Sequence, residues 1–522
     1  MNDKHEKSAF PRPGLDKLRG LKHALTDEAR ADILNARGRE GHWSARRAVT
    51  ALSDPGTFVE FGALVASPYQ DMAAPADGLI VGTARQDGAP VALFAYDYSV
   101  YAGSQSAMNH RKLARVVAHA ARHRMPVVGW LEGAGARPHD MLVYARGSST
   151  SLAQFARLSG WVPTVGIVPG HAFAGHANLA GMCDVLIAVR GAAMGLAGPP
   201  LVEAALGARL TPEEIGGLDI HIKAGVIDLV ADDAPHAVEL ARRYLSYFRE
   251  PAGLGGGPRS GPGAARPSFR PPPAEALSDI VPDNPRQAYD VRRVIEGLCD
   301  LDSVLELKQN WGRSIVTAFG RLEGRAVGIV ANQPMVMAGA INADSAAKAV
   351  RFVQTCDAYD IPILMLCDTP GLLAGPGAEA TGLARHSARL LVALANATTP
   401  IATLVLRKGY GLGHYIMGSQ ALDPVLLVAW PTAEFGGMGF EGAVSIIHRR
   451  RLAAVEDPAE RQALHARLAA ELREANTAFD AAKRFLIDDV IDPADTRGLL
   501  AGTLSAWQPP ARAARKRIID SF

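Results

Sequence analysis

The sequence predicts an α/β protein with two tandem domains that share one layout, as an internal duplication would produce. Three observations lead to this prediction. Short runs of β-branched and leucine residues each end in a glycine-rich turn and are followed by a helical pattern. Key residues then recur at a constant spacing along the chain. A segment rich in Gly and Pro separates the two sets of residues.

The recurrence is the most informative feature of the sequence. Several residues of the first half reappear 236 positions later in the second half: Gly88 with Gly324, Gly103 with Gly339, Lys112 with Lys348, Pro126 with Pro362, and Gly135 with Gly371. Asp54 and Glu60 match Asp300 and Glu306 at a spacing of 246, which indicates a small change in length. Gly175-His176 parallels Gly413-His414 at a spacing of 238. Chance agreement of glycines and prolines is the alternative, and the constancy of the spacing favours duplication.

The composition is typical of a globular enzyme. A chain of 522 residues has room for two or more domains, and its 48% hydrophobic and 21% charged residues are ordinary values. A net charge of +2 argues against general binding of nucleic acid. No apolar run approaches the roughly 18 residues of a membrane span, and the polar N-terminal segment lacks the apolar core of a secretory signal. We therefore expect a cytoplasmic protein with no membrane span.

The cysteines do not indicate a metal site or a disulfide framework. Cys183, Cys299, Cys356 and Cys367 show no Cys-x-x-Cys spacing. We expect no bound metal.

Residues 1 to about 50 combine helix-forming residues with many cations and predict a basic helical arm. Two interpretations remain open for it. The basic face is either solvated surface or a clamp for the phosphates of an anionic ligand.

The first half then alternates strand-like and turn-like stretches. Strands are expected at 57–62, 78–84, 91–96 and 127–131. Asp87-Gly88 predicts a hairpin turn, and the small-residue loop Ala102-Gly-Ser104 precedes a helix from about 105 to 123. The strand at 127–131 ends in the turn Glu132-Gly-Ala-Gly-Ala-Arg137.

A Gly-, Pro- and Arg-rich segment between the halves cannot form a packed core and predicts a linker. We place the first domain at 1–250, the linker at 251–279 and the second domain at 280–522.

The second half contains three glycine turns, each after a strand-like run. Asp368–Gly375 follows 361–367, Arg407–Ser419 follows 401–406, and Trp430–Gly439 follows 425–429. Glycine permits positive φ and close contact with the backbone. Exposed backbone N–H groups in such turns suit a reaction that places negative charge on an oxygen.

The last segment predicts one amphipathic helix that starts at Asp457-Pro458 and reaches about Phe485. Residues 487–493 are then expected to close the fold.

These motifs resemble those of the carboxyltransferase component of biotin-dependent acyl-CoA carboxylases, the propionyl- and methylcrotonyl-CoA carboxylase β-subunit group. The resemblance runs from about Asp54 to Arg497. It is densest at Tyr289–Arg292, Asn332–Pro334, Ala338-Gly339, Arg351–Asp357, Asp368–Gly375, Arg407–Ser419 and Trp430–Val444. It looks closest to the carboxyltransferase part of long multifunctional acyl-CoA carboxylase chains. The resemblance implies two crotonase-like domains, each a spiral of ββα units, in dimers or larger homo-oligomers with active sites at subunit interfaces.

The resemblance also implies which residues act. Backbone N–H groups of Ala134-Gly135 would hold the thioester enolate, and those of Leu412-Gly413 the biotin oxygen. Phe173, Ala174, Gly175 and His176 would line the acyl side, with Gly103 in support and Tyr415 in the acyl pocket. Gly339, Gly371, Tyr410 and Gly411 would support the biotin side. No side-chain base is required, because the biotin anion can itself take the α-proton.

Each of these residues also has a purely structural interpretation. Gly135 and Gly413 could be ordinary strand-to-helix turn residues, and a histidine such as His176 or His414 is more often structural than catalytic. Glu132, Asp368 and Glu434 are better explained as cap or turn residues than as acids of the reaction.

The sequence departs from the family pattern at three positions. Ala134 replaces the first glycine of a Gly-Gly pair, His176 replaces a small residue, and Tyr415 stands where short-chain members often carry Asp. The acyl group therefore cannot be assigned by analogy.

The chain carries no Ala-Met-Lys-Met-like biotinylation site and no room for an ATP-binding domain. We expect it to act with biotin carboxylase and biotin carboxyl carrier subunits, on carboxybiotin and a coenzyme A thioester. Two alternatives remain: a biotin-dependent carboxyacyl-CoA decarboxylase or transcarboxylase, and a non-catalytic paralogue that only assembles with an active subunit.

Overall fold

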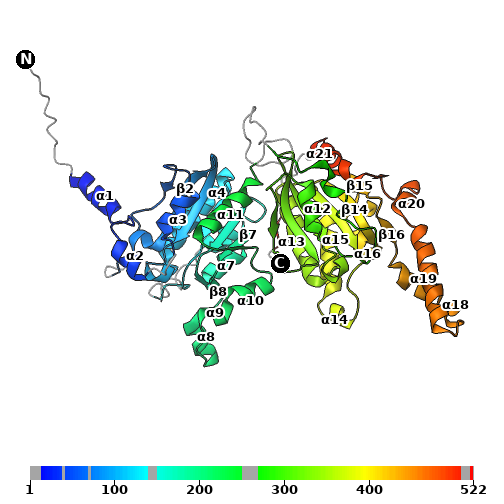
Figure 1. The fold of residues 1–522 in the computed structure, drawn as a ribbon. Coiled ribbons are helices and arrows are strands. Elements are labelled where there is room, and N and C mark those ends of the chain that lie inside the picture. Colours follow the sequence, from blue (N-terminus) through cyan, green and yellow to red (C-terminus); the bar gives the residue numbers. More distant parts are fainter. Residues whose placement is uncertain are drawn as a thin grey trace, which may run out of the picture. The chain divides into compact units, whose positions relative to one another are not determined.

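A computed structural model describes residues 13–37, 42–68, 72–138, 150–249, 269–506 and 518–520. Most of the expected linker, residues 251–268, lies outside these ranges. The chain divides into two compact units (Figure 1). The N-terminal unit comprises 1–158, 164–218 and 230–242, and the C-terminal unit comprises 159–163, 219–229 and 243–522.

The N-terminal unit contains a sheet with strand order β1-β2-β3-β4-β5-β7-β9 in the part of the chain that is described. Its strands are β1 (Val59–Glu60), β2 (Leu79–Gln86), β3 (Ala89–Tyr96), β4 (Val127–Trp130), β5 (Thr164–Val168), β7 (Val185–Val189) and β9 (Leu229–Ala231). A second small sheet pairs β6 (His171–Phe173) with β8 (Ala193–Gly195) in parallel. Strands β1 to β3 pair antiparallel, and β3, β4, β5 and β7 pair parallel.

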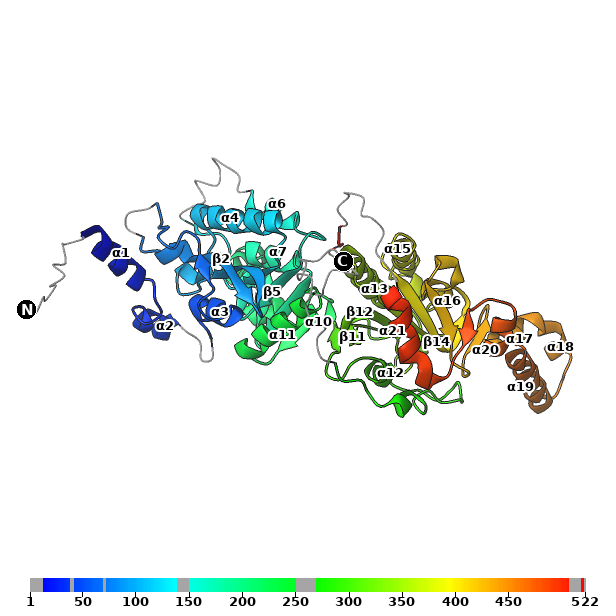
Figure 2. The same cartoon turned by 90° about the horizontal axis from the view of Figure 1, so that it is seen from above.

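Helices cover both faces of this sheet. Figure 2 shows α4 (Ala107–His123) and α6 (Ser151–Ala156) on one face, and α3 (Ala45–Leu52) and α11 (Ala234–Ser246) on the other. The other helices are α1 (Pro13–His23), α2 (Ala31–Arg37), α7 (Gly175–Gly181), α8 (Pro199–Leu206), α9 (Pro212–Gly216) and α10 (Leu218–Lys223), with short 3₁₀ turns η1 (Pro75–Gly78) and η2 (Tyr101–Gly103).

The C-terminal unit repeats this order as β10-β11-β12-β13-β14-β15-β17 among the described residues. Its strands are β10 (Leu305–Leu307), β11 (Ile315–Leu322), β12 (Arg325–Asn332), β13 (Ile363–Thr369), β14 (Ile401–Tyr410), β15 (Leu426–Ala429), β16 (Glu434–Gly436) and β17 (Asp489–Val490). The end of β14 pairs with β16 as β6 pairs with β8. The predicted duplication is therefore visible in strand order, pairing and crossovers.

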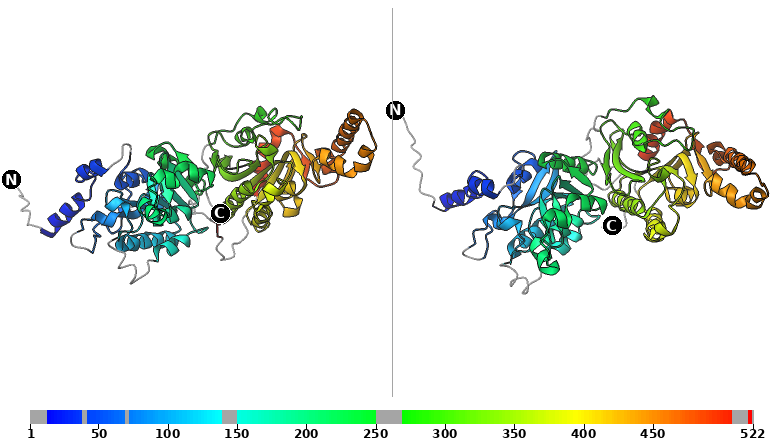
Figure 3. Two further views of the ribbon diagram at one scale, coloured as in Figure 1. Left: turned by 90° about the horizontal axis from the view of Figure 1, so that it is seen from below. Right: turned by 60° about the horizontal axis from the view of Figure 1, so that its bottom comes forward.

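Helices also surround the sheet of the second unit. They are α12 (Val291–Leu298), α13 (Ala343–Ala358), α14 (Pro376–Glu379), α15 (Leu383–Ala395), α16 (Gly411–Ile416), α17 (Phe440–Ile447), α18 (Arg449–Ala453), α19 (Pro458–Glu474), α20 (Ala478–Lys483) and α21 (Thr496–Ala506), with 3₁₀ turns η4 (Ala274–Leu277), η5 (Met337–Gly339), η6 (Gln420–Leu422) and η7 (Pro493–Asp495). Figure 3 shows α17 to α19, in orange and brown, extending away from the sheet of this unit. Apolar residues of α12 and α21 pack with alternate residues of β11 to β15 in one continuous core.

Matched residues perform the same local task in both halves. The Asp54 carboxylate accepts hydrogen bonds from the N–H groups of Asp87 and Gly88 in the β2–β3 hairpin. Asp300 accepts from Glu323 and Gly324 in the β11–β12 hairpin. The loop residues of both hairpins have positive φ, which matches the two-residue turn that Asp87-Gly88 predicted.

The expected helix from Asp457 to Phe485 is wrong in one respect, because it is two helices. Asp457 does cap α19 by accepting from the N–H of Ala459, and Pro458 is its first residue. Thr477 then caps a new helix, α20, through a reciprocal box with Asp480. The capping side chain favours a fresh helix start over continuation.

No helix among the described residues is long and apolar enough to cross a membrane.

Candidate active site

The η2 turn after β3 begins the site in the N-terminal unit. Ala102 and Gly103 both have positive φ (51° and 66°). A Cβ on Gly103 would lie 2.2 Å from the carbonyl oxygen of Glu132, so only glycine fits this contact with the turn after β4. The second unit repeats the arrangement, where a Cβ on Gly339 would lie 2.3 Å from the carbonyl oxygen of Asp368.

The turn after β4 runs alongside η2 through backbone hydrogen bonds. The N–H of Ala134 donates to the carbonyl of Ala102 (2.9 Å). The N–H of Gln105 donates to the carbonyl of Gly135, and the N–H of Arg137 donates to the carbonyl of Gln105 (2.7 Å each). Gly135 itself has φ +99°, and among the described residues no acceptor lies within hydrogen-bond distance of its N–H. Of the expected pair Ala134-Gly135, only Gly135 therefore has its N–H free.

A buried ion pair that the sequence did not single out fixes this turn. Arg137 Nη1 lies 2.6 Å from Asp77 Oδ1, and both side chains are almost fully buried. Arg137 also donates to the hydroxyl and the carbonyl of Ser104 (3.3 Å each). The sequence feature that could have indicated this ion pair is the arginine just after the glycine turn, because a planar guanidinium can bind several acceptors at once.

The β6–α7 turn meets the β4 turn in the same place. Ala174 has φ 52°, and its Cβ would lie 2.9 Å from a Cβ on Gly135. A Cβ on Gly175 would lie 2.0 Å from Gln105 Oε1. Phe173 and His176 are buried, while Ala174 and Gly175 are half-buried. Gly103, Gly135 and the segment Phe173–His176 therefore lie close together in the N-terminal unit.

The imidazole of His176 is fully buried within this cluster. Its Nδ1 lies 3.2 Å from the carbonyl oxygen of Phe173, and its ring packs edge-on to Tyr96 at 4.4 Å between centroids. Burial lowers the pKa of His176 to about 4, although the carbonyls of Phe173 and Gly103 oppose the shift. The ring is neutral at physiological pH.

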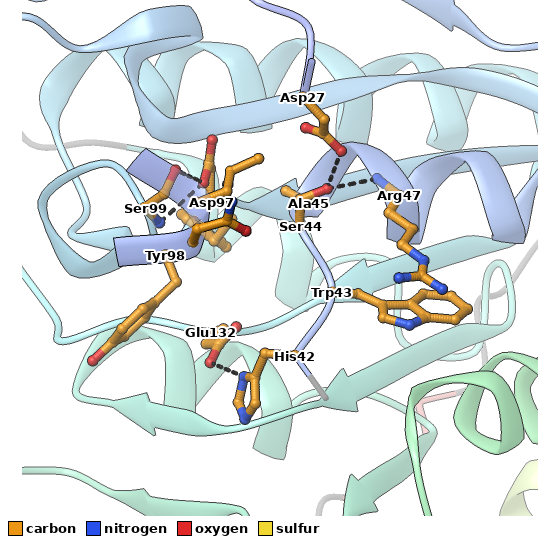
Figure 4. Close-up of a pocket in the computed structure, with 13 residues that line it drawn as sticks. Asp27, His42, Trp43, Ser44, Ala45, Arg47, Asp97, Tyr98, Ser99 and Glu132 are labelled. Carbon is orange, nitrogen blue, oxygen red and sulfur yellow. Dashed lines mark hydrogen bonds and ion pairs between the residues drawn. The ribbon is translucent and has the colours of Figure 1, made fainter. Parts of the chain in front are cut away.

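A pocket of about 400 Å³ lies behind the β4 turn in the same unit (Figure 4). Its lining includes Tyr96 and Glu132, and Glu132 pairs with Nδ1 of His42 at 3.2 Å. The guanidinium of Arg47 lies over the ring of Trp43 at 4.5 Å. The lining of this pocket carries carboxylates as well as cations.

In the C-terminal unit, a β-bulge sets the position of the expected biotin-side turn. The pairing register of β13 and β14 shifts between Cys367 and Thr369. The fully buried Asp368 carboxylate lies at this bulge and accepts from Arg407 Nε (3.1 Å) and from the backbone N–H of Lys408 (3.2 Å), with Lys408 Nζ at 3.3 Å. Asp368 was expected to be a cap or turn residue, and it lies instead within β13, where its carboxylate binds the cations of β14.

The α16 turn follows directly from this bulge. Gly411 has φ +51°, and a Cβ on Gly413 would lie 2.6 Å from the Cα of Gly371. Leu412 is 55% exposed, and among the described residues neither its N–H nor that of Gly413 has an acceptor. The first N–H groups of a helix have no partner within the helix, which explains why both are free. Tyr415 is 40% exposed on the same helix.

A second network holds Tyr410, the cap residue of α16. Its hydroxyl donates to Glu434, which also pairs with Arg473 at 2.9 Å. Burial and the Glu434 carboxylate raise the pKa of Tyr410 well above its usual value. Tyr410 therefore acts as a neutral hydrogen-bond donor that ties β14 to β16.

All four cysteines are buried free thiols, and the described residues contain no group of His, Cys, Asp and Glu arranged to hold a metal ion.

Two sheets of one topology, each followed by glycine turns, define a protein of the crotonase-like fold class. The free backbone N–H groups of those turns suit a reaction that places negative charge on an oxygen. The chain belongs to the family described as "Carboxyl transferase domain", whose model matches residues 36–518.

Named relatives agree with this assignment. The chain is 34% identical over 499 residues to the carboxyltransferase subunit of propionyl-CoA carboxylase of Haloferax mediterranei, covering 94% of this chain and 95% of that one. The structure of a single-chain, multi-domain long-chain acyl-CoA carboxylase matches with a TM-score of 0.86 and 40% identity, over 95% of this chain and 50% of that chain. The chain thus spans half the length of that enzyme.

The crystal structure of transcarboxylase 12S, a hexamer with methylmalonyl-coenzyme A bound, matches with a TM-score of 0.86 and 33% identity, over 98% of this chain and 99% of that chain. The two-domain crotonase-like fold and the biotin-dependent acyl-CoA carboxyltransferase family expected from the sequence are therefore confirmed. The chain is an enzyme that transfers a carboxyl group between biotin and an acyl-CoA.

Proposed function

We propose that this subunit transfers the carboxyl group from carboxybiotin on a carrier protein to the α-carbon of an acyl-CoA, and that backbone N–H groups are its main catalytic elements. The observation that supports this is the pair of free N–H groups at Leu412 and Gly413, next to the Gly371 turn. Free, fixed donors lower the energy of an oxygen that gains negative charge, without reorganisation during the reaction.

The residues of the C-terminal unit fit a bound biotin. Apart from its own chain neighbours, no described residue has an atom within 4 Å of the position that a Gly371 side chain would take, so there is open space beside the two free N–H groups. In the proposal, Leu412 and Gly413 donate to the ureido oxygen, while Gly339, Gly371, Tyr410 and Gly411 shape the turn around it. When bound, carboxybiotin supplies the carboxyl group and afterwards a base for the α-proton.

In the N-terminal unit, Gly135 would donate its N–H to the thioester oxygen as the enolate forms. Ala134 supports the turn instead, because its N–H is already bonded to Ala102. Gly103, Phe173, Ala174, Gly175 and His176 would hold the turn on the acyl side. Tyr415 is proposed to contact the acyl group, since it is exposed two residues after Gly413.

The partners are part of the proposal. Relatives are named as subunits or β chains of carboxylases, and transcarboxylase 12S is a hexamer. We propose that biotin carboxylase and biotin carboxyl carrier subunits supply carboxybiotin here, in the cytoplasm, to a homo-oligomer of this chain with the N-terminal unit on the acyl-CoA side. The domain limits 1–250, 251–279 and 280–522 belong to the same proposal, as does the classification as a ligase subunit.

A second candidate is transfer in the opposite direction, from a carboxyacyl-CoA to biotin. The chain is 34% identical to the methylmalonyl-CoA carboxyltransferase 12S subunit of Propionibacterium freudenreichii, the same value as for the propionyl-CoA carboxylase subunit, which keeps this alternative open. Following both the formation and the consumption of carboxyacyl-CoA with one enzyme preparation would separate the two directions. A paralogue with only an assembly role would do neither.

The sharpest test is Leu412→Pro with Leu412→Ala as its matched control. Proline removes the N–H of residue 412, while alanine keeps it, and proline is tolerated in the first turn of a helix. We expect kcat for carboxyl transfer to fall about 10²–10³-fold in Leu412→Pro, the range measured for loss of one oxyanion donor. Leu412→Ala should stay near wild type because its side chain is exposed. Wild-type turnover by a folded, assembled Leu412→Pro variant would contradict the assignment of Leu412 as a donor.

A further inference from the structure

Each half of the molecule has a Gly-His pair in the first turn of a short helix. His176 follows Gly175 in α7, and His414 follows Gly413 in α16. We propose that these two histidines are positioning residues: each ties its helix to the end of β4 or β13 and acts as a neutral imidazole, not as a proton carrier. This inference rests on the proposed function.

In the N-terminal unit, His176 connects α7 to the turn after β4. A Cβ on Gly133 would lie 2.5 Å from Cε1 of the ring, so the imidazole rests directly on this glycine. Nδ1 lies 3.2 Å from the carbonyl oxygen of Phe173, and the carbonyl of Gly103 also acts on the ring. Because a carbonyl oxygen can only accept, the one ring proton of the neutral imidazole is directed at one of these two carbonyls.

In the C-terminal unit, His414 connects α16 to the end of β13. Its Nδ1 lies 3.7 Å from Sγ of Cys367, and that sulfur lies 3.7 Å from the carbonyl oxygen of Lys408. The thiol proton can satisfy the carbonyl, so the sulfur is left to accept from the Nδ1–H of His414. The ring also packs against Gly409 and edge-on to Phe435 at 5.4 Å. The partners of the two rings therefore differ between the halves, while each ring joins its helix to a neighbouring strand end or turn.

The surroundings keep both rings uncharged. Burial lowers the pKa of His176 and that of His414 to about 4. His110 adds a smaller effect of the same sign at His176. Burial raises the pKa of the Cys367 thiol, so no thiolate faces His414. A general acid or base needs a pKa near the working pH, and neither ring meets this requirement.

The consequence is geometric. His176 fixes α7 against the turn that carries Gly135, and His414 fixes α16, which carries Leu412 and Gly413, against the end of β13. A misplacement of about 1 Å can cost about 10²-fold in rate. Loss of either tether should therefore slow the transfer without unfolding the subunit.

The kinetic test compares asparagine with leucine at both positions. Asparagine has nearly the same shape as leucine but keeps a donor near the place of Nδ1. We expect His176→Asn and His414→Asn to keep kcat within about threefold, and the leucine variants to lose about tenfold or more. His176→Leu should also raise KM for acyl-CoA, and His414→Leu should raise KM for biotin. His236→Leu, at a half-exposed position on α11, is the control for replacing a histidine as such.

Two kinetic results would overturn the proposal. One is wild-type turnover by assembled leucine variants. The other concerns the pH dependence of the rate. If the wild-type rate changes with pH around 6.5 and both asparagine variants lose that change, a histidine carries a proton in the reaction.

A second measurement does not depend on activity. Since the folded pKa of about 4 lies below the unfolded value of about 6.5, the unfolded chain binds more protons between these pH values. Stability of the wild type relative to each asparagine variant should therefore fall as the pH is lowered from 6.5 to 4. Denaturation midpoints in urea measure this difference. If the wild type transfers carboxyl groups but its stability relative to the asparagine variants does not change between pH 6.5 and 4, only the histidine assignment is overturned. A wild type that transfers no carboxyl group when carrier and carboxylase are supplied would overturn the proposed function itself.

Discussion

Gly413 illustrates how closely the two turns of the C-terminal unit approach one another. A Cβ at this position would lie 2.6 Å from Cα and 3.0 Å from the carbonyl carbon of Gly371. Both are backbone atoms, so the Gly413→Ala variant can only be accommodated if α16 or the Gly371 turn moves. We expect the movement to displace the N–H groups of Leu412 and Gly413 and to lower kcat about tenfold or more.

Steady-state carboxyl transfer measures this effect, and Gly502→Ala is its matched control. Gly502 is exposed in α21, and a Cβ there would meet nothing within 4 Å. An alanine at residue 413 that leaves kcat unchanged would mean that the α16 turn takes no part in the reaction.

Single residues also show where the sequence stops being informative. The glycine-turn motifs located Gly135 and Gly413, because positive φ and close contact leave few other residues possible. They could not show that the N–H of Ala134 is already bonded to Ala102 while that of Gly135 is free. Hydrogen bonds between turns that are distant in sequence depend on the folded geometry, which spacing does not encode. Arg137 and Asp77 escaped notice for the same reason, since their ion pair joins residues 60 positions apart.

Among the elements, the bulge between β13 and β14 has the clearest energetic consequence. Asp368 is the shared counter-ion of Arg407 and Lys408, and Arg407 is only 2% exposed. In Asp368→Asn these buried cations lose their counter-ion, which costs about 3–5 kcal/mol in comparable pairs. We expect a lower free energy of unfolding and a larger loss of kcat than the stability change alone explains, because the bulge leads into α16.

Chemical denaturation of the assembled protein provides the measurement, and Asp232→Asn is the control. Asp232 forms an ion pair with Arg190 on the surface, where both side chains are mostly exposed. Surface ion pairs contribute little to the free energy of unfolding, so the Asp232→Asn variant should be as stable as the wild type. Equal effects of the two substitutions would show that Asp368 does not stabilise the bulge.

Two buried lysines at matched positions predict a specific pH dependence. Lys348 of α13 donates to the carbonyls of Lys308, Trp311 and Ile315, and Lys112 of α4 donates to those of Ala76 and Leu79. Burial lowers the pKa of Lys348 to about 7 and that of Lys112 to about 8. The unfolded value is about 10.4.

Between the folded and unfolded pKa values of Lys348, the unfolded chain holds more protons than the folded chain. The contribution of Lys348 to stability should therefore rise with pH from about 7 to about 10. The free energy of unfolding of the wild type minus that of Lys348→Met isolates the contribution of this lysine. Lys112→Met serves as the matched comparison, and its rise should begin about one pH unit higher. A difference that stays level between pH 7 and 10 would contradict the prediction.

At the scale of the whole molecule, the duplication explains why so much of the fold could be read from the sequence. The β2–β3 and β11–β12 hairpins, the following turns and the long helices α4 and α13 all keep a spacing of 236 residues. Each repeat supplies an independent check on the other. The short strands β6, β8 and β16 were not predicted, because strands of three residues carry no periodic signal.

Two helices at matching positions carry exposed apolar surface that a single subunit leaves uncovered. α8 and α17 are separated by 241 residues, and each presents large apolar side chains to solvent. Leu201 and Leu206 are 64% and 71% exposed, and Ile446 and Ile447 are 65% and 66% exposed. Adjacent exposed apolar residues of this size mark a surface that another protein covers. A homo-oligomer is the simplest source of that cover in a family that includes a hexamer.

We therefore expect the double variant Ile446→Asp, Ile447→Asp to assemble poorly, because two carboxylates would have to be buried without partners. Sedimentation velocity should show a smaller species, and carboxyl transfer per subunit should fall on dilution more steeply than in the wild type. Val392→Asp is the control, since Val392 of α15 is equally exposed (62%) but lies on another helix. If the double variant sediments and turns over as the wild type does, α17 is not an assembly surface. The apolar side chains of α8, tested in the same way through Leu201→Asp and Leu206→Asp, would then be the next surface to examine.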